Sequence, residues 1–156
     1  MFKKVAFLAI AGAALASNGA YAATATNSLT VTSVITGGCT INPATMDFGP
    51  QILATGTINI TTPVTINCTA AVPYTLGING TVGARTMAGS NGGSLTYEVY
   101  TTAGHTTPID NAGGTNVIGG TGNGANQTVN LFGQLLPQST PPAGNFSNVS
   151  QMTVTY

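Results

Sequence analysis

The chain has 156 residues, of which 42% are hydrophobic and only 4% are charged. Its three basic residues cannot build the positive face that neutralises phosphates, which excludes a nucleic-acid-binding protein. The sequence is also poor in the residues that favour helices, which argues against a helical bundle. Its length suits a single domain.

The N-terminus has the pattern of a secretory signal peptide. Residues 1–4 contain two lysines, residues 5–15 are an apolar run, and Ala20-Tyr21-Ala22 has the small-x-small pattern of a cleavage site. A membrane anchor is the alternative, but the run is well short of the roughly 20 residues that span a bilayer. We expect cleavage after Ala22 and export of residues 23–156, in which Arg85 is the only basic side chain and the net charge is −2.

Alternation of apolar and polar residues recurs along the mature chain and predicts short strands. It occurs at residues 29–36, 39–41, 46–48, 58–68, 74–78, 85–87, 95–99, 129–135 and 152–156. Pro63 predicts an edge position or a bulge in its strand, and Asn79-Gly80 is a strong signal for a hairpin turn. Short strands with frequent turns predict an all-β fold, an antiparallel β-sandwich of immunoglobulin-like size.

Residues 101–127 are rich in Gly, Thr and Asn, and they predict a long flexible loop with a short strand at Val117-Ile118. His105 lies in this loop with little to hold it in place. A solvated histidine is therefore favoured over a catalytic one. Gly122-Asn123-Gly124 lacks the strand–loop–helix frame of a phosphate loop.

Asp47 and Glu98 could form a carboxylate pair of the glycosidase type. However, Asp47 lies between Met46 and Phe48, so we expect it to face solvent or cap a turn, and Glu98 alternates with apolar neighbours in the same way. We therefore expect no catalytic residues, no cofactor and no metal site.

Cys39 and Cys68 are the only cysteines. In an exported chain, two cysteines predict one intramolecular disulfide. An intermolecular bridge and a metal site are the alternatives, and two thiols with one distant histidine make a poor zinc site.

The strongly β-forming residues 29–36 are joined to the rest of the chain through Gly37-Gly38. Such a terminal strand can pair within its own fold. It can also leave and fill the sheet of a neighbour, because sheet edges recruit strands. Periodicity alone does not separate these two possibilities.

Several short motifs follow one another in a fixed order along the mature chain. They are Gly38-Cys39-Thr40-Ile41, Met46-Asp47-Phe48-Gly49, Cys68, Pro73-Tyr74-Thr75-Leu76, Arg85-Thr86-Met87, Leu95-Thr96-Tyr97-Glu98-Val99-Tyr100, Gly122-Asn123-Gly124, Gly144-Asn145-Phe146-Ser147-Asn148 and Met152-Thr153-Val154-Thr155-Tyr156. In this ordered set the chain resembles the spore coat protein U family, which includes subunits of archaic (Csu-type) chaperone–usher pili.

The resemblance implies an incomplete immunoglobulin-like antiparallel β-sandwich that a donor strand from a neighbouring subunit completes. It divides the chain into a cleaved signal peptide (1–22), an N-terminal donor segment (23–36) and a pilin β-sandwich domain (37–156). It also implies that the Cys39–Cys68 disulfide staples the first strand of the domain to its neighbour.

The resemblance further implies roles for particular residues. Leu29, Val31 and Ile35 would enter the groove of the neighbour, with Ser33 at a shallow position between them. A slip of one residue would instead bring Val34 inward. The groove would lie between the first and last strands, bordered by Met152, Val154 and Tyr156, and the chaperone would pair with that last strand as well.

The function implied is that of a structural subunit of a cell-surface pilus that supports adhesion and biofilm formation. Its expected partners are identical subunits, a periplasmic chaperone, an outer-membrane usher and a tip subunit. A tip adhesin or carbohydrate-binding module and a self-complemented coat protein are the alternatives. We expect a tip subunit to need an additional binding domain, and a chain with its own donor strand suits the shaft.

Overall fold

The structure, a computed structural model, describes residues 24–52 and 54–156. The predicted signal peptide, residues 1–22, lies outside the described residues. The chain separates into a part up to Val34 and a compact unit from Ile35 to Tyr156, and each is considered by itself. Within the described residues no helix is long and apolar enough to cross a membrane.

Nine strands form in the described part of the chain. They are β1 (Cys39–Ile41), β2 (Ile58–Cys68), β3 (Pro73–Ile78), β4 (Arg85–Gly89), β5 (Ser94–Tyr100), β6 (Ile118–Thr121), β7 (Asn126–Leu135), β8 (Phe146–Ser147) and β9 (Met152–Thr155). The alternating patterns from residue 39 onward predict most of these strands to within a few residues, but residues 46–48 carry no assigned strand.

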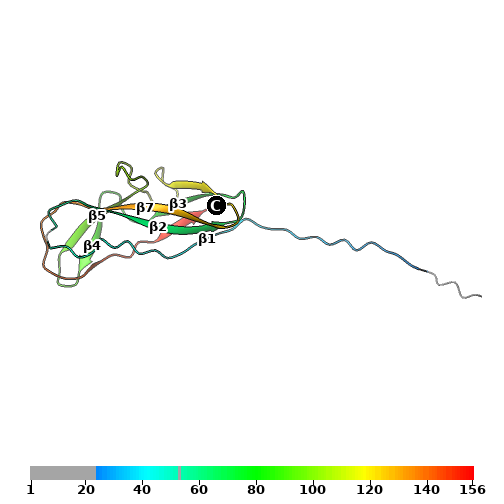
Figure 1. Ribbon diagram of the computed structural model, residues 1–156, viewed down its shortest axis with the longest axis horizontal. Coiled ribbons are helices and arrows are strands. Elements are labelled where there is room, and N and C mark those ends of the chain that lie inside the picture. Colours follow the sequence, from blue (N-terminus) through cyan, green and yellow to red (C-terminus); the bar gives the residue numbers. More distant parts are fainter. Residues whose placement is uncertain (1–23, 53) are drawn as a thin grey trace, which may run out of the picture. The chain divides into compact units, whose positions relative to one another are not determined.

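The strands form the two layers of a sandwich (Figure 1). One sheet has six strands in the order β1-β2-β7-β5-β4-β8, and the other has three in the order β6-β3-β9. All pairings are antiparallel. The predicted immunoglobulin-like antiparallel sandwich is confirmed.

The core follows from the alternation within the longest strand, β2. Its inward side chains Val64, Ile66 and Cys68 are almost fully buried, as is Leu76 of β3 in the opposite sheet. Each large apolar side chain buried in this way contributes about 1.5–3 kcal/mol. Pro63 lies beyond the part of β2 that pairs with β1, so the predicted edge position is confirmed.

The predicted hairpin at Asn79-Gly80 is wrong. Gly80 does adopt a positive φ of 122°. However, β3 and β4 on either side of it belong to different sheets, so this turn carries the chain from one layer to the other. The Asn-Gly pair signals a positive φ, which a crossover turn needs as much as a hairpin does. A hairpin occurs instead at Gly92-Gly93, between β4 and β5.

The long loop expected at residues 101–127 is shorter and better anchored than the composition suggests. β6 and the start of β7 occupy its second half. In its first half, the Ile109 side chain is fully buried. The backbone N–H of Ile109 donates to the carbonyl of Val99 (2.8 Å). One carboxylate oxygen of Asp110 accepts hydrogen bonds from the N–H groups of Thr115 and Asn116.

A disulfide joins Cys39 to Cys68, which are opposite one another in the β1–β2 pair. Beyond it, the Thr69 N–H donates to the carbonyl of Gly38 (2.9 Å). The bridge therefore holds the short first strand against its neighbour, as predicted.

We expect loss of this disulfide to lower the free energy of unfolding by about 3–4 kcal/mol, because the unfolded chain then regains the entropy of an open loop. Urea unfolding of the wild-type chain with and without dithiothreitol measures this difference. A variant carrying Cys39→Ser and Cys68→Ser is the control, and its midpoint should not respond to the reductant. Equal wild-type midpoints in the two conditions would contradict the expectation.

Candidate functional site: an open groove in the sandwich

The last strand, β9, is an edge strand. It pairs with β3 only, and no described strand covers its other side. An edge strand presents a row of unpaired backbone N–H and C=O groups, which form a template for another strand.

On the other side of this edge lies β1, the edge of the six-stranded sheet, which comes close to β9. After Ile41 the chain runs on through residues 42–52 without forming a strand. Met46 and Phe48 alternate with exposed neighbours and pack against the core, as the sequence pattern predicted. Gly133 of β7 leaves room for this, since a Cβ there would lie 2.5 Å from Met46 Sδ.

Between residues 44–48 and residues 148–152 the core is uncovered. A cavity of about 340 Å³ opens there. Its floor is formed by Thr62, Ile78, Met87, Tyr97, Val99 and Leu131, and its sides by Ala44, Thr45, Met46, Phe48, Asn148, Val149, Ser150 and Met152. A second cavity of about 790 Å³ shares Met46, Phe48 and Met87 with the first and extends to Leu95 and Leu135. We call the two cavities together the open groove.

The three border residues named from sequence lie in different places. Met152 is opposite Ile78 in the β3–β9 pair and lines the open groove. Val154 is opposite Leu76 and packs against the core. Tyr156 follows the end of β9, and 62% of its side chain is exposed.

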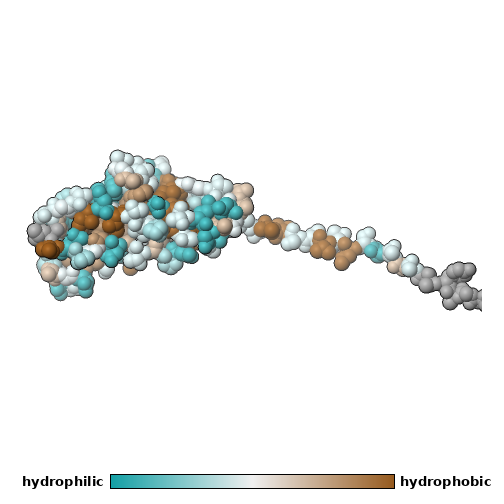
Figure 2. Space-filling view, in the orientation of Figure 1, coloured by the Kyte–Doolittle hydropathy of each residue, from teal (hydrophilic) through white to brown (hydrophobic). Residues whose placement is uncertain are grey.

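The predicted N-terminal strand has no strand conformation here. Residues 24–36 carry no assigned strand and have no partner strand. Leu29, Val31 and Ile35 are 82–87% exposed, and so is Val34 at 86%. Figure 2 shows hydrophobic side chains exposed along this segment. The segment thus keeps an apolar face that its own unit does not bury.

A small cluster of polar side chains lines part of the open groove. The sequence analysis did not predict this cluster. The Tyr97 hydroxyl donates to Asn148 Oδ1 (3.1 Å) and lies 3.1 Å from Ser150 Oγ. Ser150 Oγ also donates to Asn148 Oδ1 (2.7 Å). Thr62, which interrupts the apolar inward row of β2, lines the same cavity. The groove is therefore apolar along most of its length and polar in one section.

The expectation that Glu98 faces solvent is wrong, since it is 2% exposed and forms a buried ion pair with Arg85. The Arg85 guanidinium also donates to the carbonyls of Ile78 (3.2 Å) and Ile109 (2.8 Å). Glu98 accepts hydrogen bonds from the N–H groups of Gly83 and Val99. The alternation of apolar and polar residues predicts only which face of the strand Glu98 is on. It does not predict that loop residues, such as Gly83, cover this face.

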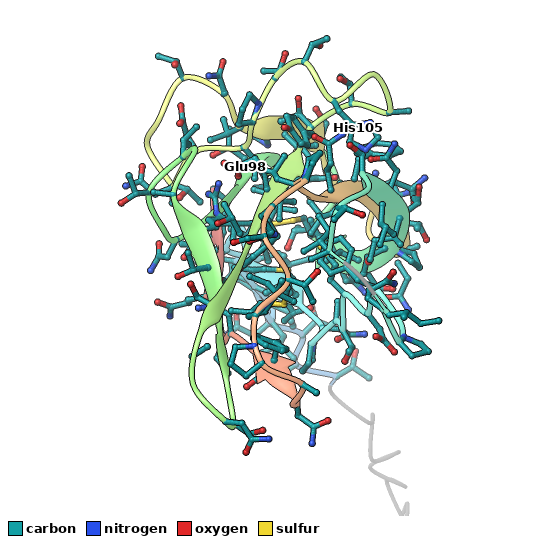
Figure 3. The ribbon with its side chains drawn as sticks, turned by 90° about the vertical axis from the view of Figure 1, so that its left-hand side faces the viewer. Glu98 and His105 are labelled. Carbon is teal, nitrogen blue, oxygen red and sulfur yellow. A yellow bond between two sulfur atoms is a disulfide. The ribbon has the colours of Figure 1, made fainter. Side chains whose placement is uncertain are left out.

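His105 is also better held than expected. Its ring packs edge-on against Tyr100 and Phe132, with centroids 5.2 and 6.5 Å away. Figure 3 shows Glu98 on β5 and His105 in the loop that follows. Burial raises the pKa of Tyr100 above its ordinary value, and the charge of Glu98 raises it further. The Tyr100 hydroxyl donates a hydrogen bond to Oε1 of Gln134 (3.2 Å).

The two candidate carboxylates do not form a catalytic pair. Asp47 accepts a hydrogen bond from the N–H of Gly49 (2.8 Å), so it caps a turn as expected. Glu98 is engaged by Arg85. Outside residues 1–23 and 53, no group of three or more His, Cys, Asp or Glu side chains could hold a metal ion.

Comparison with protein families gives a match over most of the chain. The Spore Coat Protein U domain matches residues 25–154. The chain belongs to this family. The match to the family includes both the N-terminal segment and the sandwich with its open groove.

Among solved structures, the chain is similar to a chain in the complex of the chaperone CsuC with the tip adhesion subunit CsuE, from archaic chaperone–usher Csu pili of Acinetobacter baumannii. The TM-score is 0.56 at 13% sequence identity, over 78% of this chain and 40% of that chain. The likeness supports the fold, and this chain spans less than half of the matched one. A comparison with curated proteins finds no match.

We expect Glu98→Gln to lower the free energy of unfolding by about 3–5 kcal/mol, because it leaves the buried Arg85 charge without a counter-charge. Chemical unfolding followed by circular dichroism measures the loss. The double variant Arg85→Met with Glu98→Leu is the matched control, and it should be more stable than the single variant, because no charge stays buried and only the backbone groups that the pair binds lose their partners. A single variant as stable as the wild type would refute a structural role for the pair.

Proposed function

We propose that the chain is a repeating structural subunit of a cell-surface pilus, assembled by donor-strand complementation through a chaperone–usher pathway. The observation that supports this proposal is that two parts of the chain each lack a partner that the other could provide. The sandwich has an open groove beside an unpaired edge strand. The N-terminal segment has the alternating apolar face of a strand without a sheet to join.

The two features fit one another in chemistry and in size. Added at the free edge of β9, a strand gains backbone hydrogen bonds, while its alternate side chains fill the groove. Residues 29–35 would offer three apolar side chains and Ser33 on one face. Two residues span about 6.6 Å in a strand, so the face from Leu29 to Ile35 spans about 20 Å.

The occupant we propose is the segment of a second copy. Gly38 is already hydrogen-bonded to Thr69, through its carbonyl (2.9 Å) and its N–H (3.2 Å). A hairpin returning residues 24–36 along their own domain would have to turn at Gly37 alone. Common hairpin loops need two residues or more. Insertion into a neighbour avoids this constraint and generates a linear polymer.

The remaining partners follow from the same reading. An exported subunit with an open core needs a temporary partner, which we assign to a periplasmic chaperone that covers β9 and the groove. An outer-membrane usher would then exchange that partner for the next subunit, with a tip subunit at the far end. The role is structural, and no enzyme activity is proposed. Similarity to a complex that contains a tip adhesion subunit supports this pathway.

We expect Val31→Asp to abolish polymerisation while leaving chaperone capture intact, because a carboxylate cannot enter the apolar groove without losing its hydration. Thr32→Asp is the matched control, because residue 32 lies on the other face of the strand and should tolerate the charge. Cells that express each chain with its own export genes are sheared. The released protein is run in SDS with and without boiling.

Wild type and Thr32→Asp should give an unboiled ladder that collapses to one band on boiling, and Val31→Asp should give no ladder. The reverse result for the two variants would show that the register is shifted by one residue. A single monomer band for the wild type in both lanes would favour a self-complemented domain and refute the polymer.

A further inference from the structure

Tyr97, Asn148 and Ser150 form the polar section of the open groove. Their side chains can make further hydrogen bonds. The hydroxyls of Tyr97 and Ser150 both meet Asn148 Oδ1, at 3.1 and 2.7 Å. Each hydroxyl oxygen keeps a free acceptor position, and the side-chain amide of Asn148 keeps its two N–H donors. Tyr97 is only 7% exposed, so most of its side chain is buried beneath the section. An incoming strand that covers these groups has to replace the water they now contact.

The N-terminal segment has one side chain that can do so on its apolar face. Positions 29, 31, 33 and 35 read Leu, Val, Ser and Ile. Ser33 is the one residue of this set with a hydroxyl, and it can both donate to a hydroxyl oxygen and accept from an amide N–H. One polar position on the segment thus corresponds to one polar section in the groove.

We propose that Ser33 of an incoming copy sits against Tyr97, Asn148 and Ser150, and that this contact sets the register of subunit insertion. The inference rests on the proposed function and goes beyond it, because it names the residues that select one register. It gives Ser33 a positioning role, whereas the sequence suggested only a shallow place between larger side chains.

Other registers leave the polar section worse matched. A shift by two residues places Val31 or Ile35 there, so buried hydroxyl and amide groups lose their water without gaining a partner. The same shift moves Ser33 against apolar side chains. A slip by one residue turns Thr30, Thr32 and Val34 inward, which gives up the larger apolar side chains.

With Ser33 in place, its neighbours on the same face are also assigned. Val31 and Ile35 lie about 6.6 Å to either side. The apolar lining that is available to them includes Met46, Phe48 and Met87, which both cavities share, and Ile78 and Met152. These side chains are apolar, which fits Val and Ile.

Disulfide trapping between subunits tests the register directly. Fibres are made from the full chain carrying Ser33→Cys and Ser150→Cys, and are boiled in SDS without reductant. We expect a ladder that survives boiling and collapses with dithiothreitol. The matched control carries Val31→Cys and Ser150→Cys and should collapse on boiling alone. A ladder that survives in the control and not in the first pair would overturn the inference.

A double-mutant cycle supplies a second readout that needs no new cysteine. Ser33→Val should raise the dissociation rate of fibres in guanidinium roughly tenfold, because it leaves buried polar groups unpaired. In a Tyr97→Phe, Ser150→Ala background the same change should have a smaller effect, because only the Asn148 amide is left to lose a partner. Equal effects in both backgrounds would mean that Ser33 does not contact this section. A wild-type chain that makes no fibres would instead refute the proposed function itself.

Discussion

Everything distinctive in this protein depends on one unsatisfied edge. A two-layer sandwich is stable when its inner faces are covered and its edges are paired or protected. Among the described residues, β9 has no partner strand on one side, and the core beside it is open. Both deficits occur at the same place, so one added strand would remove both. The proposal of an assembly site rests on that coincidence.

The rest of the fold compensates for this weakness by holding the borders of the groove. On one side, the disulfide fixes β1, from which the chain runs on into the lining residues 44–48. On the other side, Arg85 binds the carbonyl of Ile78, and the Ile78 side chain forms part of the groove floor opposite Met152. The buried ion pair with Glu98 thus anchors the end of β3, on which β9 depends. A covalent bond and a buried charge pair thus support the chain on the two sides of the open groove.

The sequence predicts local features well and long-range ones poorly. Alternation located β2 and the inward positions of Met46 and Phe48, because period two reports which face is buried. It misplaced Glu98, whose partner Arg85 lies 13 residues away and whose cover comes from loops. It also missed the contact of Tyr97 with Asn148, since these residues are 51 positions apart. Pairings of that kind depend on how the layers meet, which composition and spacing do not encode.

The scarcity of charge makes the polar section of the groove more important. Among residues 24–52 and 54–156, Arg85 and Glu98 neutralise each other in the interior, and Asp47 and Asp110 accept hydrogen bonds within their own turns. Little charge remains to repel identical copies or to steer them into one orientation. In the polymer that we propose, the apolar side chains oppose a slip by one residue, because it would turn smaller or polar side chains inward. Hydrogen bonds that an incorrect alignment would leave unmade would then select among shifts by two residues.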